Sequence, residues 1–345
     1  MVVRYLLTII ISVSLLACSG NESPKESVKL STAEATASDT ASAKTISFTE
    51  SKIDSFVLRY KKGDEFHYRV RQYLEAGPDT ARATTQSTHV YTKKVLSVRS
   101  DGSFEVVMRF DTIRIDAFIR NKNTGVTLVE QHYFSSDSTQ RTKDEFVQFN
   151  AIIGEDVSVF ISPRGAILQV GDVSPIVKKM VSTSKQTIPP EYVNQLSEQV
   201  KASFYSSFHG QEVVPFPTNK IDQDGKWSNA VSTPFADFFI LSTIANYHIV
   251  NVKEVKNRRL ASINASFSGS CSVRPLPKNV PFSVKVNSSS ISGTSHSLLD
   301  VEGGYTISKK TAITMHVAAT VVSPKGEKNT VSQNQTSRYE IELLP

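Results

Sequence analysis

Cysteine is almost absent from this sequence, which holds only Cys18 and Cys271 among 345 residues. Two cysteines form at most one bond, so the disulfide framework that stabilises many small secreted domains is excluded. A catalytic thiol needs a base beside it in the fold. The sequence gives no sign of such a base, so we expect Cys271 to be a buried, inert thiol.

Signatures of metal binding and catalysis are also missing. Seven histidines are scattered, and none forms His-Glu-x-x-His or another close ligand pair. There is no Gly-x-Ser-x-Gly motif, no phosphate loop and no dinucleotide fingerprint. Asp222-Gln223-Asp224-Gly225 hints at a calcium loop, but Val231 stands where the twelfth-position glutamate is needed, so we interpret it as a turn. The sequence predicts no metal, no cofactor and no enzyme. A hydrolase whose acids, histidines and serines converge from distant strands is the third alternative.

Charge is nearly balanced and spread along the chain. Lys and Arg number 39 against 33 Asp and Glu, for a net charge of +6. No basic stripe of the kind that nucleic-acid binding needs is present, so nucleic acid is not an expected partner. Basic residues occur in pairs, among them Lys61-Lys62, Lys93-Lys94 and Lys309-Lys310. We interpret them as solvated turn residues, with contact to anionic lipid head groups as the alternative.

Only one long apolar run exists, from Tyr5 to Leu16 after Arg4. It is shorter than the roughly 20 residues of a membrane-spanning helix and is typical of a secretory signal. Its end, Leu15-Leu16-Ala17-Cys18, resembles the signals of bacterial lipoproteins. The resemblance implies a diacylglycerol thioether on Cys18, cleavage after Ala17 and acylation of the new amino terminus, as by palmitate. An uncleaved apolar anchor with an incidental cysteine is the alternative.

This resemblance also indicates a compartment. It implies an envelope protein held to a membrane by the lipid on Cys18. Ser19 follows the cysteine, where Asp favours inner-membrane retention in enteric bacteria, so we expect the outer membrane, on its periplasmic side. Residues 1–17 are then the signal peptide. Residues 18–46, rich in Ser, Thr, Ala, Lys and Glu, are predicted to be a disordered tether, because they have too little apolar surface to bury.

The remaining chain is predicted to be mainly β. Alternating residues such as Phe104, Val106, Met108 and Phe110 indicate half-buried strands. Asp101-Gly102 and Ser162-Pro163-Arg164-Gly165 indicate hairpin turns. Between two β-rich stretches, Val193, Leu196, Val200, Phe204 and Phe208 recur at helical spacing after Pro190, and Gly210 is a natural stop. We therefore expect a first β unit at 47–172, a helical segment at 173–212 and a second β unit at 213–345.

The two β stretches resemble each other. Shifted by 157 positions, Phe104, Val106, Met108 and Phe110 fall on residues 261, 263, 265 and 267, of which Ile263 and Phe267 are large and apolar. Any two β meanders share alternation, so chance similarity is the alternative to duplication. The predicted fold is two related, curved antiparallel β meanders, incomplete barrel-like sheets, with a helical segment between them.

This layout has a distant architectural similarity to the bacterial lipoprotein-carrier and sensor fold, a curved incomplete barrel covered by helices. The chain is also similar to an uncharacterised group of secreted bacterial β proteins, through Lys62-Gly63-Asp64-Glu65-Phe66, Phe216-Pro217 and Gly225-Lys226-Trp227. The first resemblance implies an enclosed apolar cavity, and the second implies no activity.

The leading functional hypothesis is therefore a non-enzymatic, lipid-anchored envelope protein that binds a lipid or another apolar ligand in a concave sheet. Apolar side chains of both β stretches would line the ligand: Phe104, Val106, Met108, Phe110, Ile263 and Phe267. The alternative is a structural or interaction lipoprotein with a packed core that contacts another envelope protein. A solvent-reachable cavity favours the first hypothesis, and a filled interior favours the second.

Overall fold

The structure is a computed structural model, and it describes residues 44–51, 53, 55–78, 81–183, 189–209, 212, 214, 216–217, 221–235, 239–255, 258–275 and 282–345. The predicted signal peptide and Cys18 lie outside these residues. Among the described residues, no helix has both the length and the apolar character needed to cross a membrane.

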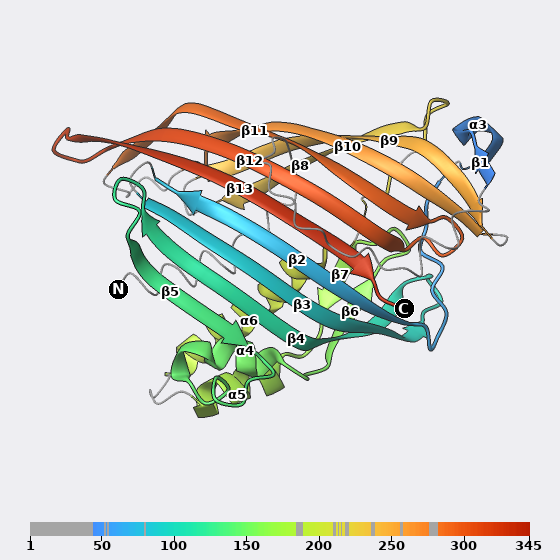
Figure 1. The fold of residues 1–345 in the computed structure, drawn as a ribbon, viewed down its shortest axis with the longest axis horizontal. Helices are drawn as coiled ribbons and strands as arrows, with labels where there is room; N and C mark the ends of the chain where they lie inside the picture. Colours follow the sequence, from blue (N-terminus) through green and yellow to red (C-terminus); the bar gives the residue numbers. More distant parts are fainter. Residues whose placement is uncertain are drawn as a thin grey trace. The chain divides into compact units, whose positions relative to one another are not determined.

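The prediction of a mainly β protein is confirmed, because thirteen strands form one antiparallel sheet that does not close on itself. Long alternating strands dominate the chain (Figure 1). The strands are β1 Lys44–Ile46, β2 Glu65–Gly77, β3 Ala81–Val98, β4 Phe104–Asn121, β5 Thr127–Phe134, β6 Val157–Ile161, β7 Ile167–Val170, β8 Lys226–Phe235, β9 Phe239–Val255, β10 Arg258–Val273, β11 Ser283–Asp300, β12 Thr306–Val322 and β13 Lys328–Leu343. The helices are α3 Phe48–Ser51, the 3-10 helix η2 Asp144–Phe146, α4 Val147–Ile152, α5 Ser174–Thr183 and α6 Pro190–His209.

The chain divides into two units. Unit 1 contains Leu58–Val214 and Ser337–Pro345, and unit 2 contains Pro215–Thr336 together with the segment that ends at Val57. Strand β13 therefore belongs to both units. The helices α5 and α6, which the sequence places between two β units, lie in unit 1.

Unit 1 is built on the neighbours β2, β3 and β4, with β5 and β6 pairing with different halves of β4. One face of these strands is apolar because alternate residues point the same way. Tyr68, Val70 and Val106 on it are fully buried. We call this the buried face of unit 1. The opposite face carries charged side chains such as Arg69 and Arg71, which pair with Glu342 and Glu340 at 3.5 and 3.7 Å.

The helices of unit 1 gather beside β4 and β5, where Figure 1 shows them in green and yellow. Helix α5 packs against α4 and α6, and α6 contacts β7. Helix α6 begins at Pro190, as predicted, and its Val200 and Phe204 are buried. The side chain of Phe208, the last residue of the predicted stripe, lies outside the described part.

Both predicted hairpin turns of unit 1 are confirmed. Gly102 and Gly165 have φ angles of +80° and +81°, a region that glycine enters without strain. The amide of Arg99 donates to the carbonyl of Ser103 at 2.8 Å, and Asp101 accepts from the Ser103 amide at 2.9 Å. These contacts close the β3–β4 connection.

Unit 2 contains β8 to β12, β1 and the first part of β13. Its strands run in the hydrogen-bonded order β1, β9, β10, β11, β12, β13, with β8 also on β9. Ile249, Ile263 and Ile313 share one face and are almost fully buried. We call this the buried face of unit 2. The opposite face of β10 and β11 is rich in serine and threonine.

One predicted boundary is wrong. Residues 44–46, assigned to the disordered tether, form β1 and pair with β9, with Ile46 beside Val252. The long strands β9 and β11 run unbroken through serine-containing stretches, from Phe239 to Val255 and from Ser283 to Asp300. The duplication is still a hypothesis, and the hairpin registers differ: Val98 faces Phe104, whereas Val255 faces Arg258.

Candidate functional site

The four predicted lining residues of unit 1 lie on the buried face of β4. Phe104, Val106, Met108 and Phe110 are at most 8% exposed. Tyr60 packs on Phe104 with ring centroids 5.2 Å apart, and Phe204 of α6 packs on Phe110 at 5.7 Å. The protein's own side chains therefore contact this row.

A buried ion pair lies on the same face. The Lys93 and Glu212 side chains are 1% and 6% exposed and contact each other directly. Lys93 Nζ also donates to Tyr60 Oη at 2.8 Å, and Tyr91 Oη donates to Glu212 Oε2 at 2.8 Å. Nζ lies 4.8 to 5.1 Å from the ring centroids of Tyr60, Phe66 and Tyr68. Cation and carboxylate thus both have several partners, as buried charges require.

The surroundings of Lys93 keep its ammonium group charged. Burial alone lowers the pKa of the Lys93 ammonium, but Glu212 and Tyr60 outweigh burial, so that pKa lies above its ordinary value. Burial and then the Glu212 charge raise the pKa of Tyr91 well above its usual range. Lys93 is consequently a fixed cation, and its contact with Glu212 ties the segment after α6 to the sheet.

The interpretation of Lys93-Lys94 as two solvated turn residues is wrong for Lys93. The two lysines point to opposite faces of β3, and the Lys94 side chain is 53% exposed and 3.2 Å from Glu65. Alternation with Tyr91 and Val95 is the sequence signal that places Lys93 inside. Nothing in the sequence points to its partner, which is 119 residues away.

The other two predicted lining residues, Ile263 and Phe267, lie on the buried face of unit 2. They are 1% and 6% exposed. Small and large side chains flank them in the neighbouring positions of the ladder. Ala265 lies opposite Ser295 and Tyr247, and Phe267 lies opposite Gly293 and Ala245. Of the described helices, only α3 belongs to this unit, and it packs on β9.

The buried face of unit 2 also carries polar side chains, and one of them lacks a hydrogen bond. Gln335 of β13 is 2% exposed, and its Nε2 has no hydrogen-bond partner among the described residues. On the opposite face, His316 Nδ1 lies 2.9 Å from Asn334 Oδ1, which places Met315 beside Gln335. Met315 is fully buried. A buried amide donor without a partner calls for an acceptor that the protein does not supply.

The sequence motifs around Phe216 and Trp227 meet in an aromatic cluster of unit 2. Phe56 lies 5.6 Å from Phe216 and 6.0 Å from Trp227, measured between ring centroids. Trp227 stacks on Tyr247 at 5.1 Å with an interplanar angle of 9°. Gly225 turns the chain into β8 with φ +75°, where a Cβ would meet the Phe48 ring at 3.1 Å. The motifs Phe216-Pro217 and Gly225-Lys226-Trp227 therefore contribute side chains to the core beside β8 and β9.

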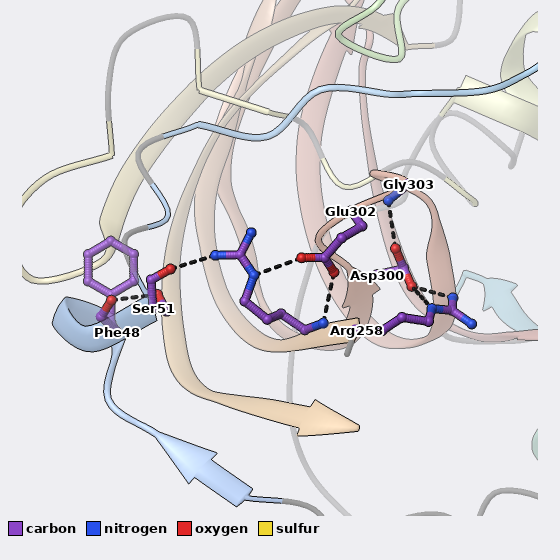
Figure 2. A network of polar contacts seen from close by, with 7 residues as sticks. Phe48, Ser51, Arg258, Asp300, Glu302 and Gly303 are labelled. Atoms are coloured by element: carbon purple, nitrogen blue, oxygen red, sulfur yellow. Dashed lines mark hydrogen bonds and ion pairs between the residues drawn. The ribbon is translucent and has the colours of Figure 1, made fainter. Parts of the chain in front are cut away.

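A polar network fastens the ends of two hairpins in unit 2 (Figure 2). Asp300, 1% exposed, accepts from Arg258 Nε at 2.8 Å and from the Gly303 amide at 2.6 Å. Arg259 donates to Glu302 Oε1 at 2.7 Å and to the Ser51 carbonyl at 2.6 Å. Each charge has a partner, and the network joins α3 to the β9–β10 and β11–β12 connections.

Metal and thiol chemistry have little support in the described part of the chain. No group of three His, Cys, Asp or Glu side chains there is arranged to hold a metal ion. Cys271 is buried, as predicted, and burial raises the pKa of its thiol to about 11. A thiol with that pKa is protonated at neutral pH and is a poor nucleophile.

Comparison with known proteins gives a family and distant structural similarities. The model of a family described as "Family of unknown function (DUF6263)" matches residues 111–302, which are 192 of the 345 residues. No curated protein matches the chain. Among solved structures, it is similar to lipovitellin, from a study of lipid–protein interactions, with 9% identity and a TM-score of 0.40 over 83% of this chain and 26% of that chain.

Two outer-membrane proteins of Pseudomonas putida are also similar to the chain. The COG4313 channel of strain F1 has 6% identity and a TM-score of 0.20 over 83% of this chain and 97% of that one. OprB at low pH has 4% identity and a TM-score of 0.21 over 81% and 92%. The chain spans about a quarter of the lipovitellin chain that it matches.

Proposed function

Because the chain belongs to the DUF6263 family, whose function is unknown, we propose a function from the chain's own residues: a membrane-anchored envelope lipoprotein that binds a lipid acyl chain on the buried face of unit 2. The protein is not an enzyme in this proposal. The lipid on Cys18 holds it at the periplasmic side of the outer membrane.

The observation that carries the proposal is the isolated amide of Gln335. Within the described part of the chain, its Nε2 is a buried hydrogen-bond donor without a partner, and the apolar Met315 lies beside it. An unsatisfied buried donor costs about 1–3 kcal/mol. The ester or amide carbonyl of an acylated molecule would accept from this donor, while the acyl chain would lie along Ile263, Phe267 and Met315. Ala265, between Ile263 and Phe267 on β10, and Gly293, opposite Phe267, are small neighbours against which the acyl chain would lie.

Native mass spectrometry of the mature chain, residues 18–345 carrying Cys18→Ser, tests the proposal. We expect a discrete acyl-bearing species to copurify with it. Gln335→Leu should reduce the bound fraction, because the carbonyl loses its donor, and Asn334→Leu, on the opposite face of β13, should leave it unchanged. A ligand-free mass in all three proteins would contradict acyl binding.

Lipid attachment needs its own test in cells. Full-length protein should incorporate a clickable fatty acid, and Cys18→Ala should abolish the label. Label that persists in the variant would contradict attachment at Cys18.

The second candidate is a scaffold that contacts another envelope protein. It is favoured by the packing of Phe104 and Phe110 under Tyr60 and Phe204, since that row contacts protein instead of a ligand. It is also favoured by β5, where Leu128 and Phe134 are 59% and 45% exposed. In-cell cross-linking from position 128 should capture a partner if this candidate holds.

A further inference from the structure

Four polar side chains form a patch on the buried face of unit 1, away from the Lys93–Glu212 pair. Gln72 of β2 lies directly opposite Ser87 of β3. Thr85 and His89 lie two residues to either side of Ser87 and therefore point the same way. Opposite them stand Leu74, 5% exposed, and Val70, fully buried. We call Gln72, Thr85, Ser87 and His89 the polar patch.

The side chains of the polar patch lack hydrogen-bond partners in the protein. No bond or ion pair involves the side chains of Gln72, Thr85 or Ser87 within the described part of the chain, and His89 Nε2 is a buried atom without a partner. The His89 ring lies near two aromatic rings, those of Phe110 at 5.5 Å and Tyr91 at 6.4 Å between centroids. All four patch residues are half-buried, so a ligand from solvent can reach the patch.

The other face of the same strands is different. Thr92 donates to Asp111 at 2.6 Å and lies 3.0 Å from His67 Nδ1. Arg69 pairs with Glu342 at 3.5 Å. Thr92 and Arg69 on that face thus have charged partners, whereas the side chains of the polar patch have none among the described residues. Polar groups gathered without partners on a half-buried face are the arrangement expected where a ligand completes their hydrogen bonds.

The chemistry of the patch selects an uncharged ligand. Two hydroxyls, one carboxamide and one imidazole offer both donors and acceptors. The strand neighbours Val70, Leu74, Ile113 and Ile115 carry no charge, so an ionic group would lose water without gaining a counter-ion. Burial lowers the pKa of His89 to about 4, so the imidazole is neutral at neutral pH.

We propose that the polar patch binds an uncharged, hydroxyl-rich group: a sugar or polyol, either free or as the head group of a lipid. This site is in unit 1 and goes beyond the proposed function, because it stands whether or not unit 2 binds an acyl chain. Each hydroxyl of such a group both donates and accepts, as the patch requires.

Saturation-transfer NMR on the mature chain, residues 18–345 with Cys18→Ser, tests the proposal. The probes are methyl β-D-glucoside, octyl β-D-glucoside below its micelle concentration, and octyl sulfate. Both glucosides binding equally supports a free sugar or polyol, and octyl glucoside binding alone supports a lipid head group. Stronger binding of octyl sulfate than of octyl glucoside, or no binding of either glucoside, would overturn the proposal.

Matched variants on the two faces locate the binding. Gln72→Leu and Ser87→Ala should each weaken glucoside binding about fivefold, the effect of one lost hydrogen bond. Gln86→Leu and Thr88→Val alter neighbouring residues that point to the other face, and they should leave binding unchanged. Thermal unfolding of each variant confirms that it is folded. Equal weakening by Gln72→Leu and Gln86→Leu would place binding elsewhere and contradict the proposal.

Discussion

Lys93 is a buried cation whose one carboxylate contact shown in the structure is Glu212. Its ammonium group is almost fully buried and contacts the Glu212 carboxylate, with Tyr60 as a further acceptor. Removing one member of such a pair leaves the other charge in a medium of low polarity. The exposed Lys94 beside it offers a matched comparison in the same strand.

Replacing Lys93 with methionine should lower the free energy of unfolding by about 3–5 kcal/mol. Lys94→Met should change it by less than about 1 kcal/mol, because exposed ion pairs contribute little. The double variant Lys93→Met/Glu212→Gln should recover most of the loss, since no unpaired charge remains buried. Urea unfolding of the three proteins measures these differences, and equal effects of the two single variants would contradict the buried pair.

His89 makes stability depend on pH. Its pKa is about 4 in the folded protein because of burial, against 6.5 ordinarily. Between these values the unfolded chain binds more protons, so stability is complete above about pH 6.5 and falls as pH drops to 4. The loss is at most about 3 kcal/mol. We expect His89→Gln to flatten the pH dependence of unfolding between pH 6.5 and 4.

His132 provides a control of opposite sign. The carboxylates of Asp116 and Glu130, which accept from its ring nitrogens, raise the pKa of this exposed histidine. The stability it adds is present below pH 6.5 and is lost as pH rises through the folded pKa. His132→Gln should therefore remove a gain in stability as pH falls from the folded pKa to 6.5, and it should leave the slope between pH 6.5 and 4 unchanged. An unchanged slope in His89→Gln would show that its imidazole stays solvated.

An aromatic contact helps to hold helix α6 on the sheet of unit 1. Phe204 is 2% exposed and packs on Phe110 of β4. Phe204→Ala should lower the free energy of unfolding by about 3–5 kcal/mol, the usual effect of deleting a buried ring. Tyr205→Ala, at a residue that is 41% exposed, should have a much smaller effect. Comparable losses in both variants would argue against packing of α6 through Phe204.

For individual strands, the sequence pattern predicts some and misses others, and the difference has a physical reason. The alternation from Phe104 to Phe110 specifies β4 locally, because each apolar residue faces the core. The first part of β3, Ala81 to Gln86, is polar and small, and it is a strand only because β2 and β4 pair with it on both sides. The serine-rich part of β11 is held in the same way. Long-range pairing of this kind leaves no local signal.

The features of the candidate sites also differ in whether the local sequence predicts them. The burial of Ile263 and Phe267 follows from their own alternation, so the sequence predicts it. The isolation of Gln335 and the pairing of Lys93 with Glu212 depend on which distant residues face them. The polar patch depends on the register between β2 and β3, which the sequence alone does not determine.

The stability of the whole molecule depends on where the folded part of the chain begins. Strand β1 pairs with β9 and buries Ile46, 8% exposed, so the body begins by residue 44. A chain of residues 47–345 should unfold at a lower urea concentration than one of residues 44–345. The free energy of unfolding should fall by about 1.5–3 kcal/mol, because the buried isoleucine is lost. Ile46→Ala in the longer chain should reproduce most of this loss. Identical midpoints of the two chains would show that β1 adds no stability.

The division of β13 between the units bears on how the protein is made. Residues 337–345 complete unit 1, where the Leu344 amide donates to the carbonyl of His67 at 2.7 Å. The ribosome makes β2 long before it makes β13, its neighbour in the sheet. One edge of β2 is therefore unpaired until synthesis is almost finished. Such an open strand is prone to aggregate. Unit 1 can therefore complete its sheet only after the last residues of the chain have been made.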